Sequence, residues 1–103
     1  MVLTVLTQEQ RADALAQAAQ ARTRRAEVKV ALKSGSMRLS EFLDAAKGDE
    51  VLGKMKVVSL LQSMPRVGAT TASAVMAQVG ISASRRVRGL GAHQRAELIR
   101  RFG

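Results

Sequence analysis

The chain has 103 residues, with 17 lysines and arginines against 8 acidic residues and a net charge of +9 at pH 7. This length allows one domain, or one small domain with a helical arm, and the absence of cysteine excludes a disulfide framework and a thiolate zinc site. No apolar run approaches the roughly 18 residues of a membrane span, and the opening MVLTVLTQEQ has no charged leader, so we expect a cytoplasmic protein.

The first predicted element is a long helix that ends at Gly35. Thr7 and Gln10 are spaced as in a capping box, and helical propensity stays high until the Ser-Gly-Ser sequence around Gly35. A helix of about 26 residues is ~40 Å long at ~1.5 Å per residue, which is more than a domain of this size can cover. We therefore predict a helical arm over residues 1–35 and a second domain over residues 36–103.

The second half of this arm carries a stripe of positive charge. The spacing of three and four residues places these side chains on one helix face. The stripe consists of Arg22, Arg25, Lys29 and Lys33. Two interpretations remain open: a solvated face of a surface helix, or a second nucleic-acid contact made by the arm.

Four more helices follow, at about 39–47, 51–64, 69–79 and 92–102. Pro65 ends the second of them because the residue before a proline is pushed out of the α region, and Gly80 ends the third. In the second helix the side chains expected to be buried are Leu52, Met55, Val58 and Leu61. No strand alternation occurs, so the predicted fold class is all-α.

Positive charge is concentrated in the second half of the chain. Residues 1–53 hold eight lysines and arginines against seven acids, whereas residues 54–103 hold nine against Glu97 alone. A field of one sign attracts a polyanion, which favours a nucleic-acid partner. No helix in this half joins a long apolar face to a basic one, so a membrane surface is not the expected partner.

The sequence Met-Pro-Arg-Val-Gly before the helix at 69–79 resembles the helix-hairpin-helix signature, whose turn usually reads Pro-Gly-apolar-Gly. Pro65, Val67, Gly68 and the small Ala72 match, while Arg66 stands where glycine is usual. A positive φ at Arg66 would cost roughly a kcal/mol. In the signature the amides at the head of the second helix hold a DNA phosphate. Two interpretations of Arg66 remain open: the turn tolerates it, or its side chain adds a direct phosphate contact. The alternative for the whole motif is a hairpin that merely packs.

A cluster of arginines lies between Gly80 and Gly89. Arg85, Arg86 and Arg88 repel one another, and the sequence between Glu50 and Glu97 contains no acid that could balance them. Such runs are usually solvated surface. A chain keeps them most readily when the partner supplies the negative charge, so we predict a nucleic-acid contact here.

Taken together, the hairpin, the sequence SRRVRGLG and the last helix resemble a helix-two-turns-helix domain. The chain is similar to the family of actinobacterial integration host factors. Besides the hairpin, the likeness covers LTQEQRADAL at 6–15, RAEVK at 25–29, GKMKV at 53–57 and SRRVRGLG at 84–91. It implies a long N-terminal helix followed by a helix-two-turns-helix domain. It also implies a nucleoid protein that organises the chromosome by bending or condensing double-stranded DNA with low sequence specificity.

The same resemblance implies which residues contact DNA. They are Lys54, Lys56, the turn from Pro65 to Gly68, Arg85, Arg86 and Arg88. We expect a monomer in the absence of DNA, with no metal and no cofactor. We do not expect an enzyme: His93 is the only histidine, and residues 69–84 lack the lysine or aspartate used by helix-hairpin-helix glycosylases.

One alternative comes from a different class of protein. A structural, RNA-binding protein of the small ribosomal subunit would have a similar hairpin, turn and helix. Such proteins usually carry a long basic tail, whereas this sequence ends at Phe102 and Gly103.

Overall fold

The computed structural model describes residues 7–103, and over this range the chain is helical with no named strand. The elements are α1 (Gln8–Ser34), α2 (Leu39–Ala46), α3 (Glu50–Gly53), α4 (Val57–Gln62), α5 (Ala69–Val79), the 3-10 helix η1 (Val87–Gly89) and α6 (Ala92–Phe102). The prediction of an all-α fold with a long N-terminal helix is confirmed. The first six residues of the predicted arm lie outside the described residues.

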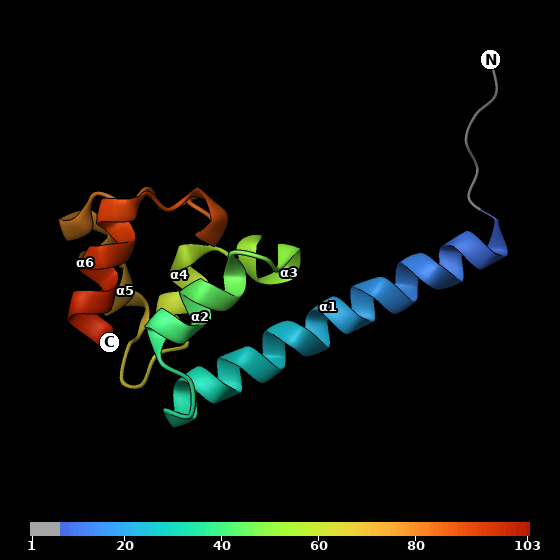
Figure 1. Ribbon diagram of the computed structural model, residues 1–103, viewed down its shortest axis with the longest axis horizontal. Helices are drawn as coiled ribbons and strands as arrows, with labels where there is room; N and C mark the ends of the chain where they lie inside the picture. The colour runs from blue at the N-terminus through green and yellow to red at the C-terminus, as the bar shows by residue number, and fades with distance from the viewer. Residues whose placement is uncertain (1–6) are drawn as a thin grey trace, which may run out of the picture.

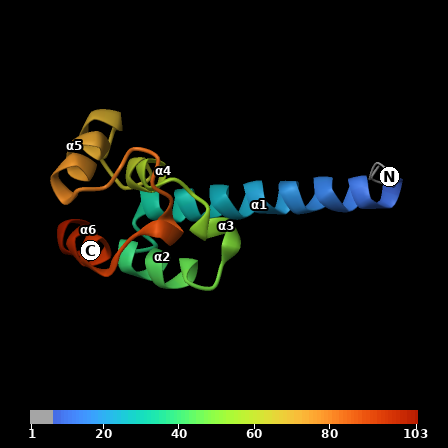
Figure 2. The same ribbon diagram turned by 90° about the horizontal axis from the view of Figure 1, so that it is seen from above.

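Helix α1 begins and ends where its local sequence predicts. The Thr7 hydroxyl accepts from the Gln10 amide at 3.1 Å, and the Gln10 side chain accepts from the Thr7 amide at 2.9 Å. Gly35 closes the helix with a φ of 81°, a conformation that favours glycine. Figures 1 and 2 both show the N-terminal half of α1 running away from the other helices.

The core lies between the last turns of α1 and the five other α-helices. Val28 and Leu32 are the buried residues of α1, whereas Leu15, in the projecting half, is 70% exposed. The largest fully buried side chains are Val28, Leu32, Leu39, Phe42, Leu52, Val57, Leu60, Leu61 and Leu98. Each such side chain stabilises the fold by about 1.5–3 kcal/mol relative to an exposed position. The division at residue 35 stays a prediction.

The predicted single helix over 51–64 is wrong, because two shorter helices, α3 and α4, occupy this range. Between them the backbone pairs with the arginine cluster. The Val57 amide donates to the Arg85 carbonyl at 2.9 Å, and the Val87 amide donates to the Met55 carbonyl at 2.8 Å. A continuous α-helix would direct both groups into its own hydrogen bonds, so the pairing interrupts it.

This interruption also changes which side chains reach the core. Buried as predicted are Leu52, Met55 and Leu61. Val58, predicted to be buried, is only half-buried, because α4 starts anew after the break and turns Val57 and Leu60 inward instead. The helix periodicity therefore has to be counted from the start of α4.

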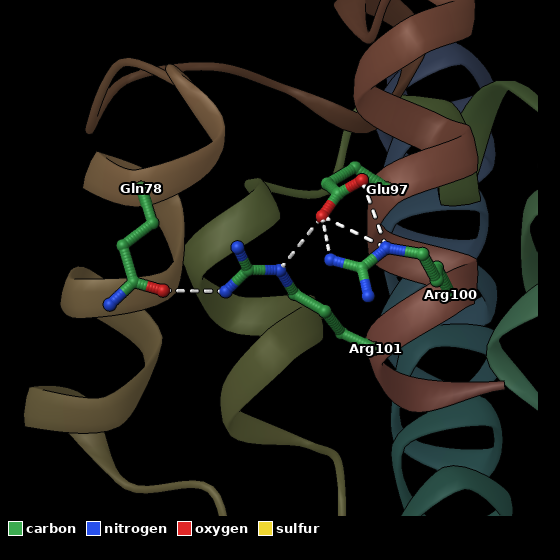
Figure 3. A network of polar contacts seen from close by, with 4 residues as sticks. All are labelled: Gln78, Glu97, Arg100 and Arg101. Atoms are coloured by element: carbon green, nitrogen blue, oxygen red, sulfur yellow. Dashed lines mark hydrogen bonds and ion pairs between the residues drawn. The ribbon is translucent and has the colours of Figure 1, made fainter.

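A polar network holds α6 against α5. Figure 3 shows the Glu97 carboxylate between the guanidinium groups of Arg100 and Arg101, while Arg101 also reaches the side-chain oxygen of Gln78. The hydrogen bond from Arg100, helped by Arg101, lowers the pKa of Glu97 from its ordinary 4.5 to about 2. The only acid in the basic half of the chain is thus already neutralised within its own helix.

We expect the stabilising effect of Glu97 to depend on pH. Its pKa is lower in the folded chain than in the unfolded chain, so the stabilisation is complete above pH 4.5 and is lost as the pH falls toward 2. Urea unfolding of the wild type and of Glu97→Gln should therefore differ at neutral pH and converge near pH 2. A difference that does not change with pH would contradict this role of the carboxylate.

Candidate nucleic-acid interface

The first part of the interface is the hairpin formed by α4, a tight turn and α5. The Val67 amide donates to the Met64 carbonyl at 3.3 Å, which closes the turn around Pro65 and Arg66. The Met64 and Val67 side chains are buried, while Pro65 and Arg66 are exposed at the tip. Buried apolar residues on both sides thus fix the turn and present its tip to solvent.

Arg66 has a φ of 65° and is the only non-glycine residue with a positive φ among residues 7–103. Proline followed by a residue of positive φ, with a hydrogen bond across the turn, is typical of a type II turn. The sequence expectation that glycine would suit this position is therefore supported by the backbone. Arg66 adopts a conformation that costs an ordinary residue about 1–2 kcal/mol.

We expect Arg66→Gly to be more stable than Arg66→Ala by about 1 kcal/mol, because glycine adopts a positive φ without the steric cost. The two variants lose the same charge, so their difference isolates the backbone term. Denaturant unfolding at one pH and salt concentration would measure it. Equal stability of the two variants would show that the turn relaxes when the arginine is removed.

The second helix of the hairpin starts without a side-chain cap. Gly68 is the N-cap residue of α5, and no side chain of the described residues bonds to the helix start. The amides of the first turn, at Ala69, Thr70 and Thr71, point along the helix axis without helical partners. All three residues are exposed, so the positive end of the helix dipole faces solvent beside Arg66.

Lys33 holds this hairpin to α1. Its ammonium group donates to the carbonyl oxygens of Gln62 at 3.1 Å and of Met64 at 3.2 Å, at the C-terminal end of α4. These carbonyls carry the negative end of the α4 dipole, which suits a cation. The last residue of the predicted basic stripe therefore positions the hairpin relative to the arm.

The arginine loop, residues 81–91, is the second part of the interface. Its apolar residues Ile81, Val87 and Leu90 are buried. Two arginines also brace it: the Arg85 guanidinium donates to the Gly89 carbonyl at 2.8 Å, and the Arg86 guanidinium donates to the Lys54 carbonyl at 2.6 Å. Each guanidinium has further donors, so both can brace the loop and still bind an anion.

A basic cleft forms where the loop, the α3–α4 connection and α1 meet. Its volume is about 380 Å³. The lining residues are Arg25, Lys29, Lys54, Met55, Lys56, Ser59 and Arg86. Five of these seven side chains are cationic and none is acidic, so the cleft presents a field of one sign. Such a site suits phosphate groups.

The cleft joins residues that the sequence presents as separate features. Lys56 and Arg86 face each other in an isolated antiparallel bridge, which aligns the connection with the arginine loop. Arg25 and Lys29 approach from α1, one helical turn apart. The arm and the loop therefore contribute to one surface and not to two distant ones.

The other predicted residues do not enter this cleft. Arg22 is exposed on α1, and Arg85 is half-buried on the loop. Arg88 lines a different pocket of about 160 Å³ together with Lys47 and Arg95. The three loop arginines thus do not converge on one point. The sequence did not indicate that Lys47 and Arg95 lie beside Arg88, because no local pattern marks them.

Sequence reasoning also missed an ion pair that anchors the arm. The Arg24 guanidinium lies 3.2 Å from the Asp49 carboxylate. Asp49 caps α3 as well, accepting from the amides of Val51 at 2.9 Å and Leu52 at 3.2 Å. Arg24 and Arg25 are neighbours in sequence but lie about 100° apart around the helix, so one binds α3 while the other lines the basic cleft.

Two classes of feature are absent from residues 7–103. None of their helices is long and apolar enough to cross a membrane. Within the same residues, histidine, cysteine, aspartate and glutamate side chains form no group of three that could hold a metal ion.

Comparison with protein families identifies the domain type of most of the chain. A family described as the S13-like H2TH domain matches residues 32–102. The match begins inside α1, at the buried Leu32, and ends at the last residue of α6. The predicted helix-two-turns-helix domain is confirmed by this match.

Full-length relatives are also similar to this chain. Integration host factor of Mycobacterium tuberculosis is 50% identical over 103 residues, covering 100% of this chain and 98% of the relative. Integration host factor of Streptomyces coelicolor is 52% identical over 103 residues, covering 100% and 96%. A solved structure described as sIHF bound to an 8bp palindromic DNA is 50% identical with a TM-score of 0.82, covering 84% of this chain and 98% of that one.

Proposed function

Since the chain belongs to the integration host factor family, we propose that it is an architectural protein of the nucleoid that binds double-stranded DNA. One observation carries the proposal: the basic cleft, which collects five cations from three separate parts of the chain without any acid. A solved relative at 50% identity is described as bound to DNA, which supports DNA as the partner of this chain.

The chemistry of the cleft suits the DNA backbone. Arginine forms paired hydrogen bonds with phosphate oxygens, and lysine neutralises phosphate as a compact charge. Neutralising phosphates releases condensed counterions, which gives affinity without reading the bases. Asparagine and glutamine, the usual readers of adenine, do not line the cleft, so sequence specificity should be low.

The hairpin supplies a separate phosphate contact. The exposed first turn of α5 offers backbone amides and the positive end of a dipole, and Arg66 adds a cation beside them. Because Lys33 ties the hairpin to α1, the hairpin and the cleft keep a fixed relation. Two fixed phosphate sites on one small protein give the anchorage that bending a duplex requires.

The proposed DNA contacts comprise the cations of the cleft, the hairpin tip, and three arginines that lie outside the cleft on α1 and the arginine loop. They are Arg22, Arg25, Lys29, Lys54, Lys56, Arg66 and the turn around it, Arg85, Arg86 and Arg88. Lys33 joins them as a residue that places the hairpin. The protein acts as a DNA-binding monomer in the cytoplasm, condenses the chromosome and catalyses no reaction.

We expect binding to duplex DNA to depend strongly on salt. With about five to eight phosphates neutralised, log K against log salt should fall with a slope of roughly −4.5 to −7. Fluorescence anisotropy on a short duplex between low and physiological salt would measure this slope. A slope near zero would contradict the proposal.

The S13-like character of the matched domain favours one alternative, a structural RNA-binding protein of the small ribosomal subunit. The same titration on a structured RNA of equal length separates the two. An architectural DNA protein should bind duplexes of scrambled sequence with similar affinity and favour them over the RNA. A clear preference for the RNA would instead support the alternative.

A further inference from the structure

The arginine loop leaves the helical framework at Gly80 and returns to it at Gly91. One side chain, Gln94 at the start of α6, bonds both ends. Its amide nitrogen donates to the Gly80 carbonyl at 2.9 Å, and its amide oxygen accepts from the Gly91 amide at 3.0 Å. A single residue therefore closes the neck of the loop.

The two backbone groups at the neck of the loop are best bonded by a side-chain amide. The Gly80 carbonyl needs a donor and the Gly91 amide needs an acceptor, and glutamine carries both on one group. Glutamate would keep the acceptor but lose the donor, while lysine would do the reverse. Gln94 is half-buried, so part of its side chain is packed against the protein.

The rest of the loop is braced but not closed. Ile81, Val87 and Leu90 pack into the core, and the Arg85 and Arg86 side chains donate to nearby carbonyl groups. The backbone at Arg85 and Val87 bonds to Val57 and Met55, which fixes the middle of the loop. None of these contacts joins one end of the loop to the other. Holding the ends together limits the conformations open to the segment between them.

We propose that Gln94 is a positioning residue for DNA binding. It closes the neck of the arginine loop and so holds Arg85 and Arg86 in place before DNA arrives, without contacting DNA itself. Binding then requires less ordering of the loop. This inference rests on the proposed function, since it assigns a role within the same interface.

The test replaces Gln94 with methionine, which keeps the length and removes both hydrogen bonds. We expect the affinity for a short duplex to fall by about tenfold while the salt slope stays unchanged, because no phosphate contact is lost. Hydrogen exchange of the Val87 amide and its neighbours in residues 81–91 should become faster. Circular dichroism and thermal unfolding should stay close to those of the wild type.

Gln78→Met is the matched control, because Gln78 contacts Arg101 of α6 but neither end of the loop. In this control, hydrogen exchange in residues 81–91 and DNA affinity should change much less than in Gln94→Met. If Gln94→Met lowers helix content, Gln94→Glu serves for the exchange comparison, because it keeps the acceptor for the Gly91 amide at the start of α6. Its added negative charge would itself weaken DNA binding, so its affinity is not compared. It should still speed exchange near Gly80.

Three results would overturn the assignment. A salt slope smaller by about 1 in Gln94→Met would show that a cationic phosphate contact is lost in the complex, which a role limited to ordering the free loop does not allow. Unchanged exchange in residues 81–91, or an equal effect in the control, would show that the neck is not held by this side chain. If the wild type does not bind duplex DNA, the proposed function fails, while the exchange comparison still tests the closure.

Discussion

Replacing Arg85, Arg86 and Arg88 together with alanine should lower the affinity for duplex DNA by about a thousandfold and reduce the salt slope by about 2.7, since each lost phosphate contact accounts for about 0.9. This is the largest effect we expect on binding. Titrating the same duplex with wild type and variant over a range of salt concentrations would measure both quantities. Unchanged binding would place the interface elsewhere on the molecule.

Substituting the same three residues with lysine is the control for charge. The lysine variant should keep the salt slope and most of the affinity, because a lysine neutralises phosphate but lacks the planar guanidinium. Both variants lose the braces from Arg85 to Gly89 and from Arg86 to Lys54, so both should melt slightly earlier than the wild type. Loss of helix content in the alanine variant would mean that the loop arginines are needed for folding.

The basic cleft should show the second largest effect. Replacing Arg25, Lys29 and Lys56 with alanine should weaken duplex binding on the order of a hundredfold. Three phosphate contacts are again lost, but two of them come from lysines, which lack the paired hydrogen bonds of arginine. Within residues 7–103 these side chains form no hydrogen bond or ion pair, in contrast to Lys33 and Arg24. Melting temperature should therefore change little, which circular dichroism can check.

A variant with the same loss of charge controls for the net field of the protein. Replacing Arg11, Arg38 and Arg100 removes as many positive charges but leaves the cleft and the pocket at Arg88 intact, while Glu97 stays paired with Arg101. Long-range attraction alone would make the two variants equally weak. If instead the cleft variant binds as well as the wild type, the stripe on α1 is only a solvated surface.

Arg25 and Lys29 also bear on DNA condensation. The sequence alone suggests a separate contact made by the arm, which would affect condensation of long DNA more than binding to a short duplex. In the structure both residues line the same cleft as Lys56 and Arg86. Changing them should therefore weaken short-duplex binding and condensation together.

Much of the fold could be predicted from short stretches of sequence. The capping box at Thr7 and Gln10, the left-handed Gly35 and the turn before α5 each depend on residues within a few positions of one another. Such local signals act on neighbouring backbone groups, so they can be recognised without tertiary structure. The concentration of positive charge after residue 53 is likewise a property of the sequence itself.

Tertiary structure decided how these parts meet. The break between α3 and α4 arises because backbone groups at Met55 and Val57 bond to the arginine loop, and the brace from Arg86 to Lys54 spans 32 positions. Helix periodicity carries no information about such distant partners, so the sequence alone could not place Arg25 and Arg86 in one cleft. Hydrogen bonds between segments far apart in the chain, and not local propensity, created the binding surface.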